Sequence, residues 1–102
     1  MNQRALGMLG LCARAGKVVT GEKAVVQAIR NGTCCLALLD GGVAGNGEKA
    51  VSQACTTHEV PLLRTEPGEL GSAIGKPNRM AAAITDPGMA KRLQQLCEPT
   101  GE

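Results

Sequence analysis

The spacing of hydrophobic and polar residues along this chain switches repeatedly between two periods. Stretches with apolar residues at every third or fourth position predict amphipathic helices, and short apolar or β-branched runs between them predict strands. Helices are predicted at 2–14, 21–30, 48–57, 67–74 and 87–97, and strands at 17–20, 34–39, 60–64 and 80–85. Strands that alternate with helices favour an α/β fold with helices on both faces of one sheet.

Residues that typically start helices stand at the ends of these segments. Thr20 is placed to cap the second helix, with Glu22 in its first turn, and Pro67 suits the first turn of the fourth helix. Asp86 followed by Pro87 is the usual cap and first residue of a helix, here the last one. These local signals agree with the helical periodicity.

The length of the chain and its middle strand indicate a single packed core. Cys34 to Leu39 is a continuous apolar run, which is typical of a strand buried on both faces. The chain has 102 residues, a usual length for one domain, and it shows no internal repeat or linker. We therefore expect one domain over residues 1–98, followed by a flexible tail over residues 99–102.

Composition narrows the class of protein. With 43% hydrophobic and 20% charged residues the chain is typical of globular domains, and no apolar run is long enough to cross a membrane. The N-terminus shows no signal-peptide pattern, so we expect a cytoplasmic protein with no membrane contact. The five cysteines are odd in number and irregularly spaced, which argues against a disulfide framework and favours their use as small hydrophobic residues.

Neither a metal site nor a cofactor is expected. The one spacing that resembles a pair of zinc ligands is Cys55-Thr-Thr-His58, and no second pair accompanies it. We therefore interpret His58 as a surface residue at the end of a helix.

Motifs for catalysis are missing as well. Gly42 and Gly47 have the separation found in a phosphate-binding loop, but Glu48 precedes Lys49 and Ala50 replaces the required hydroxyl residue. No nucleophile stands in a recognisable arrangement with a general base. We expect no enzymatic activity and interpret the glycine-rich segment as a flexible connection, with small-ligand binding there as an alternative.

Charge is distributed unevenly along the chain. Residues 1–34 carry five basic residues and one acidic residue. Residues 35–75 carry two basic and five acidic residues, and residues 76–102 carry four basic and three acidic residues. The first and last thirds would form a basic face if they meet in space. The chain has no Phe, Tyr or Trp, so it cannot stack bases on aromatic rings and would recognise a nucleic acid by shape, phosphates and base edges.

Two segments combine basic side chains with glycine. In the first, Gly21 precedes a helix whose unpaired N-terminal amides favour anions. Lys17 and Lys23 lie on either side of Gly21 in the sequence. Lys23 can also donate to the O6 and N7 atoms of guanine. The second is the loop before the last strand, which is stiffened by proline and contains Lys76, Pro77, Asn78 and Arg79.

Four stretches follow one another in an order that covers nearly the whole chain. They are Leu9-Gly-Leu-Cys-Ala-Arg-Ala-Gly-Lys-Val-Val-Thr-Gly21, Ala28-Ile-Arg-Asn-Gly32, Leu70-Gly-Ser-Ala-Ile-Gly75 and Ala83-Ile-Thr-Asp86. Together they resemble the kink-turn-binding superfamily of ribosomal proteins, which includes L7Ae and L30e, and within it the bacterial YlxQ branch. The resemblance implies a three-layer α-β-α sandwich with a four-stranded mixed sheet.

The resemblance also implies a function and a site. Proteins of this superfamily bind kink turns, which are sharp bends in duplex RNA flanked by sheared G·A pairs, through the start of the second helix and the loop before the last strand. Those regions are here Gly21 to Gln27 and Gly75 to Met80. We therefore expect a non-catalytic, monomeric, ribosome-associated protein whose partner is RNA. The predicted RNA-binding residues are Lys17, Gly21, Glu22, Lys23, Gln27, Lys76, Pro77, Asn78 and Arg79, with Arg14 and Arg30 at the rim.

The second helix departs from the Gly-x-Asn-Glu-x-x-Lys pattern of the superfamily. Lys23, Ala24 and Gln27 stand where asparagine, glutamate and lysine are usual. Lys23 and Gln27 keep hydrogen-bond donors, whereas Ala24 has none. The apolar side chain that the superfamily places near RNA would be Met80 or Pro77. An alternative is a protein-interaction module of the same fold that has lost RNA binding and meets a basic partner through its acidic middle third.

Overall fold

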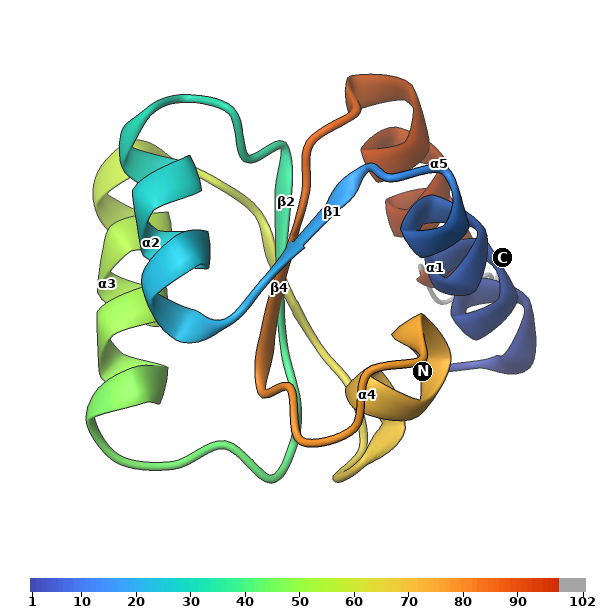
Figure 1. Cartoon of the computed structure of the whole chain (residues 1–102). Helices are drawn as coiled ribbons and strands as arrows, with labels where there is room; N and C mark the ends of the chain where they lie inside the picture. The colour runs from blue at the N-terminus through green and yellow to red at the C-terminus, as the bar shows by residue number, and fades with distance from the viewer. Residues whose placement is uncertain (98–102) are drawn as a thin grey trace.

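A four-stranded sheet runs through the middle of the molecule, with helices on both of its faces (Figure 1). The computed structural model describes residues 1–97, so the predicted tail over residues 99–102 lies outside the described residues. The strands are β1 (Val18–Thr20), β2 (Leu36–Leu39), β3 (Leu62–Arg64) and β4 (Ala81–Ile84). The helices are α1 (Gln3–Arg14), α2 (Glu22–Arg30), α3 (Asn46–His58), α4 (Glu69–Ile74) and α5 (Pro87–Cys97).

The sheet is mixed, as expected. Its strands lie in the order β1-β4-β2-β3, with β4 antiparallel to both of its neighbours and β2 parallel to β3. Helices α2 and α3 cover one face, and α1, α4 and α5 cover the other (Figure 1). The predicted three-layer α-β-α sandwich with a four-stranded mixed sheet is confirmed.

The two central strands divide the hydrophobic core into two halves. Successive side chains of a strand point to opposite faces, so Leu36 and Leu38 pack with α1, α4 and α5, while Ala37 and Leu39 pack with α2 and α3. All four residues of β2 are buried, which confirms the prediction from its continuous apolar run. Strand β4 is also fully buried, and Ala81 and Ala83, on its other face from Ala82, let α2 pack closely over the sheet.

The start of α2 differs from the prediction, whereas the start of α5 agrees with it. Thr20 is the last residue of β1, where it pairs with Ala82, so it does not cap α2. Gly21 is the N-cap instead, at φ 99° and ψ 141°, and no side chain caps the helix. Asp86 caps α5 as predicted, because its Oδ2 accepts a hydrogen bond from the Met89 amide at 2.9 Å.

Two further helix starts were misplaced by the sequence signals. Helix α3 begins at Asn46, two residues before the predicted start, since Gly45 at φ 71° turns the chain directly into the helix. Helix α4 begins at Glu69 after Gly68, so Pro67 lies in the preceding turn and not in the first turn of the helix. The predicted strands 34–39, 60–64 and 80–85 are each longer than the observed β2, β3 and β4.

The cysteines and the histidine occupy the kinds of position that were expected. Burial, together with the nearby thiol of Cys55, raises the pKa of Cys34 to about 12, so this thiol stays protonated at neutral pH. His58 is exposed and ends α3, as predicted. All five cysteines are free thiols, buried at Cys12, Cys34 and Cys55 and half-buried at Cys35 and Cys97.

Candidate nucleic-acid interface

The amino end of α2 presents unpaired backbone amides beside exposed polar side chains. Because its N-cap is Gly21, no side chain accepts hydrogen bonds from the first amides, and the positive end of the helix dipole is left open to an anion. Val25 is fully buried and fixes the orientation of the helix on the sheet. Lys23 and Gln27, one turn apart, are both exposed and lie on one side of α2.

Glu22 lies differently from these two residues. Its half-buried side chain packs against Gly47 in the first turn of α3, where an added Cβ would overlap the Glu22 carboxylate. A carboxylate beside a helix N-terminus is favoured by the helix dipole, whereas beside RNA it would repel phosphate. The geometry therefore gives Glu22, one of the predicted RNA-binding residues, a contact that joins α2 to α3.

The loop from Gly75 to Met80 is held in shape by backbone contacts. The Lys76 amide donates to the carbonyl oxygen of Gly71 at 2.9 Å, and a Cβ at position 71 would lie only 2.8 Å from the Lys76 oxygen. Gly75 and Asn78 both adopt positive φ, at 74° and 68°. The side chains of Lys76, Pro77, Asn78 and Arg79 are all exposed on this defined backbone.

The sheet brings these two predicted segments together. The Gly21 amide donates to the carbonyl oxygen of Ala81 at 3.0 Å, so the start of α2 lies against the residue at which the loop enters β4. The Asp40 amide donates to the Met80 oxygen at 2.9 Å from the other side. Residues separated by more than 50 positions in the sequence thus form one end of the sheet.

A buried carboxylate that the sequence analysis did not single out organises this end of the molecule. Asp40 is 1% exposed and follows β2 directly. Its side chain accepts hydrogen bonds from the amides of Gly42 and Gly68 at 2.9 Å and of Leu70 at 3.1 Å, and from the Thr65 hydroxyl at 3.2 Å. These bonds tie the glycine-rich turn to the start of α4, and α4 in turn supports the Gly75–Met80 loop.

The hydrogen bonds also decide the charge state of Asp40. Burial by itself raises the pKa of this carboxyl, but the backbone amides and the Thr65 hydroxyl lower it by more, and the pKa stays below its usual value. Asp40 is therefore ionised at neutral pH. The adjacent glycine-rich segment, predicted to be a flexible connection, is anchored at its beginning, because Gly41 contacts the Thr65 backbone so closely that a Cβ would lie 2.6 Å from its oxygen.

Not all predicted basic residues gather at this end. Lys17 precedes β1, and its carbonyl oxygen accepts hydrogen bonds from Thr85 at the opposite end of the sheet. It is thus separated from Gly21 by the length of β1, roughly 10–13 Å at about 3.3 Å per residue. Arg30 lies at the other end of α2 from Lys23. Arg14, at the end of α1, lies closer to the loop because it lines a cavity together with Lys76.

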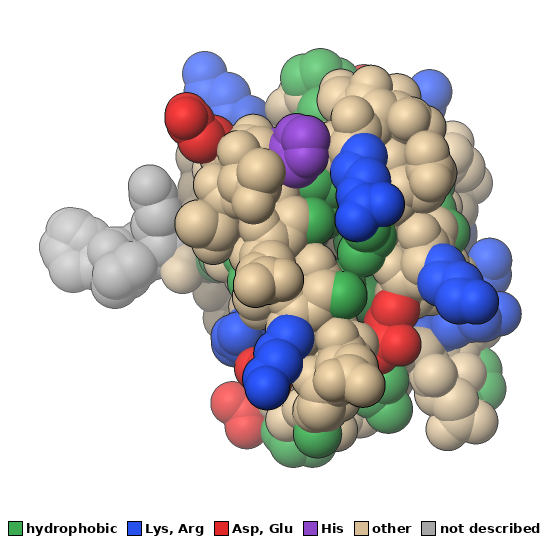
Figure 2. Space-filling view, turned by 90° about the vertical axis from the view of Figure 1, so that its left-hand side faces the viewer, with side chains coloured by type: hydrophobic (Ala, Val, Ile, Leu, Met, Phe, Trp, Pro, Cys, Tyr) green, Lys and Arg blue, Asp and Glu red, His purple; other side chains and the backbone are tan. Residues whose placement is uncertain are grey.

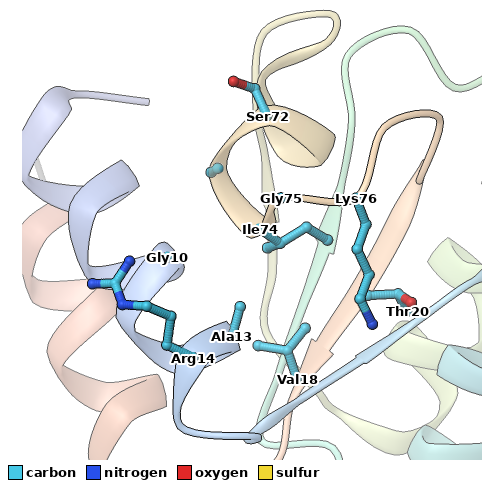
Figure 3. A pocket seen from close by; sticks show the side chains of 10 residues that line it. Gly10, Ala13, Arg14, Val18, Thr20, Ser72, Ile74, Gly75 and Lys76 are labelled. Atoms are coloured by element: carbon cyan, nitrogen blue, oxygen red, sulfur yellow. The ribbon is translucent and has the colours of Figure 1, made fainter.

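That cavity has a volume of about 390 Å³ and lies between α1, β1 and α4 (Figure 3). Arg14 and Lys76 stand on opposite sides of it, and the side chains of Ala13, Val18 and Ile74 lie between them (Figure 3). Thr20 and Ser72 complete its lining. The sequence contained no local signal for this cavity, since its walls come from three separate segments.

A second hollow of about 480 Å³ follows the groove between α2 and α3. Hydrophobic side chains are visible in this groove, and both basic and acidic side chains stand around it (Figure 2). Its lining includes Glu22, Lys23, Val26, Gln27, Arg30, Asn46, Gly47 and Ala50. The mixed charges make this face less suited to a polyanion than the end formed by α2 and the loop.

Within residues 1–97, no three His, Cys, Asp or Glu side chains come close enough together to hold a metal ion. None of the described helices has the length and hydrophobicity that crossing a membrane requires.

Comparisons with known proteins identify similar chains. The sequence matches the Ribosomal protein L7Ae/L30e/S12e/Gadd45 family over residues 3–94. It is 40% identical over 92 residues to RNA-binding protein YlxQ of Bacillus subtilis (strain 168), covering 89% of this chain and 92% of the relative. It is 34% identical over 97 residues to RNA-binding protein YlxQ of Enterococcus faecium, covering 94% of this chain and 93% of the relative. A solved structure of a protein with unknown function from Bacillus halodurans C matches with a TM-score of 0.87 at 32% identity, covering 93% of this chain and 97% of that one.

Proposed function

The chain belongs to the Ribosomal protein L7Ae/L30e/S12e/Gadd45 family, and from this premise we propose that it is a non-catalytic RNA-binding protein that recognises kink turns and associates with the ribosome. The resemblance to the YlxQ branch is confirmed by two relatives, both named RNA-binding protein YlxQ. One structural observation carries the proposal. The hydrogen bond between the Gly21 amide and the Ala81 oxygen places the start of α2 beside the Gly75–Met80 loop, so that both can contact one bent RNA.

The two parts would contact RNA in different ways. The open amides at the start of α2 suit a phosphate or a guanine edge, and Lys23 beside them can donate to guanine O6 and N7. Lys76 and Arg79 on the loop suit backbone phosphates. Since the loop is already fixed by its contacts with Gly71 and Asp40, little conformational entropy is lost on binding.

The first test is a calorimetric or gel-shift titration with a short kink-turn RNA. The comparison RNA has the same length, with its G·A pairs replaced by Watson–Crick pairs. We expect binding to the kink turn alone, weakening steeply between roughly 50 and 200 mM salt because several phosphates release counterions. Equal binding to both RNAs would reject kink-turn recognition, and binding to neither would favour the protein-interaction alternative.

A pair of matched variants then locates the site. Arg79→Ala removes an exposed cation from the loop, and Arg92→Ala removes an exposed cation from α5, which is not part of the candidate interface. We expect Arg79→Ala to weaken kink-turn binding and to reduce the log–log salt slope by about 0.9, while Arg92→Ala changes neither. Equal effects of the two substitutions would mean that general charge, and not the loop, decides binding.

Ribosome association needs a separate measurement. Sucrose-gradient sedimentation of a cell extract should place the protein in ribosomal fractions at low salt and release it after ribonuclease treatment. Association that survives digestion of the RNA would point to a protein partner instead.

A further inference from the structure

The cavity between α1, β1 and α4 is not explained by kink-turn contacts at the start of α2. Its floor is apolar, formed by Ala13, Val18 and Ile74, and its open side carries Arg14 and Lys76 at opposite edges (Figure 3). A volume of about 390 Å³ falls in the range of sites that hold small organic ligands, which combine apolar walls with a few placed polar groups.

The electrostatic surroundings favour an anion. None of the described residues that line the cavity carries a carboxylate, and among residues 1–97 neither Arg14 nor Lys76 takes part in an ion pair. The two long helices of this layer, α1 and α5, contain four basic residues and no acidic ones. Both cations are therefore available to a phosphate, which Arg14 can bind through two parallel hydrogen bonds.

The position of the cavity connects it with the loop. Lys76 belongs to the exposed Gly75–Met80 loop and also lines the cavity. Gly75 lines it as well, and Thr20 borders it directly before the N-cap of α2. An RNA strand that runs from the start of α2 past the Gly75–Met80 loop would therefore pass the mouth of the cavity.

We propose that this cavity binds one unpaired nucleotide of an RNA strand that extends beyond the kink turn. Its base would lie on Ala13, Val18 and Ile74, and the phosphates on the two sides of this nucleotide would contact Arg14 at one edge and Lys76 at the other. This site rests on the proposed RNA binding, and it adds recognition of a single-stranded extension to it.

The test compares a minimal kink-turn RNA with the same RNA carrying a single-stranded extension of about four nucleotides, placed at each end in turn. The parent protein should bind one extended RNA about tenfold more tightly, since a charge-assisted phosphate contact contributes on this scale. Ala13→Leu fills the cavity with a residue that suits a helix, and Arg14→Ala removes one cation. Both variants should lose the gain from the extension, and Ala13→Leu should still bind the minimal RNA as the parent does.

Arg4→Ala is the matched control, because Arg4 is exposed on the same helix and does not line the cavity. It should keep the gain, and thermal unfolding should show all three variants to be folded. Arg14→Ala should in addition lower the salt slope for the extended RNA by about 0.7, the value for one phosphate of a single strand. The proposal would be overturned if Ala13→Leu and Arg14→Ala kept the higher affinity for the extended RNA. It would also be overturned if neither extension raised the affinity of the parent protein.

A second measurement does not depend on kink-turn binding. A single-stranded tetranucleotide and free adenosine monophosphate are titrated separately into labelled protein, and the backbone amide shifts are followed by NMR. Shifts at Ala13, Ser72 and Ile74 with the tetranucleotide, absent in Ala13→Leu, support the site even if the minimal kink turn is not bound. Shifts with free adenosine monophosphate alone would overturn the RNA assignment in favour of a free nucleotide, and no shifts with either would overturn the site.

Discussion

The two halves of the candidate interface are built by different physical means. The start of α2 owes its open amides to local backbone geometry, because Gly21 can adopt φ 99° and has no side chain with which to cap the helix. The Gly75–Met80 loop owes its shape to distant residues, since it rests on Gly71 and is joined to Asp40 through the Met80 oxygen. One half is therefore set by a single residue and the other by a network.

This difference determines where substitutions should act. Changes in the supporting network lie away from RNA and should alter stability and loop shape together. Changes on the exposed side of α2 should alter RNA binding and leave the folded state as it is. The four predictions that follow separate these effects, beginning with the largest.

Asp40→Ala should produce the largest change. It leaves the amides of Gly42, Gly68 and Leu70 without their acceptor in a buried place, which should lower the free energy of unfolding by about 3–5 kcal/mol. Urea unfolding followed by circular dichroism measures this. Asp40→Asn, which keeps the size and one acceptor oxygen, should cost less and remain folded. A loss below about 1 kcal/mol for both would show that Asp40 does not hold the network.

Gly71→Ala should come next. Its Cβ would lie 2.8 Å from the Lys76 oxygen and 3.3 Å from the Pro77 Cα, so the loop must shift at a cost of about 1–3 kcal/mol. Amide NMR shifts should change over the Gly75–Met80 loop, and kink-turn binding should weaken. Gly7→Ala is the control, because position 7 is exposed in α1 with no atom near the added Cβ. It should stabilise the protein by about 0.5–1 kcal/mol.

Lys23→Ala tests the other half of the interface. Kink-turn binding should weaken by about 1–3 kcal/mol if Lys23 reads a guanine edge, and the unfolding free energy should stay within about 0.5 kcal/mol of the parent. Lys91→Ala on α5 removes an equal charge from an exposed helix position and should change neither quantity. If Lys23→Ala binds the kink turn as tightly as the parent does, Lys23 does not contact the RNA.

The smallest effect expected is a dependence of stability on acid pH. The pKa of Glu69 is lowered first by the hydrogen bond from the Glu66 amide and then by the N-terminal amine, and the pKa of Asp40 is lowered as well. Both carboxyls therefore bind fewer protons in the folded state than in the unfolded state. The stability that they contribute is complete above their unfolded values, 4.5 for Glu and 3.8 for Asp, and is lost as the pH falls through their folded pKa values.

Urea unfolding at a series of pH values from about 6 down to about 2 measures this dependence. The free energy of unfolding should decline below about pH 4.5, and Glu69→Gln should decline less steeply than the parent. A parent protein with pH-independent stability across this range would contradict the lowered pKa values.

Much of the fold could be predicted because helices and strands leave local traces in the sequence. The helices and strands of residues 1–97, the burial of β2 and the Asp86 cap of α5 follow from periodicity, composition and neighbouring residues. The prediction that Thr20 caps α2 was wrong because a hydroxyl before a helix is only a preference. Pairing with Ala82 in the sheet kept Thr20 in an extended conformation. Local signals could not anticipate that competition.

The sequence by itself determined the inventory at the candidate site: basic side chains without aromatic ones, a glycine before α2 and a stiff loop before β4. The tertiary structure decided which of these meet. It joins Gly21 to Ala81, places Lys17 at the far end of β1, turns Glu22 toward α3, and opens a cavity between Arg14 and Lys76. The physical reason is that periodicity arises within one segment, whereas a site depends on hydrogen bonds and packing between segments far apart in the chain.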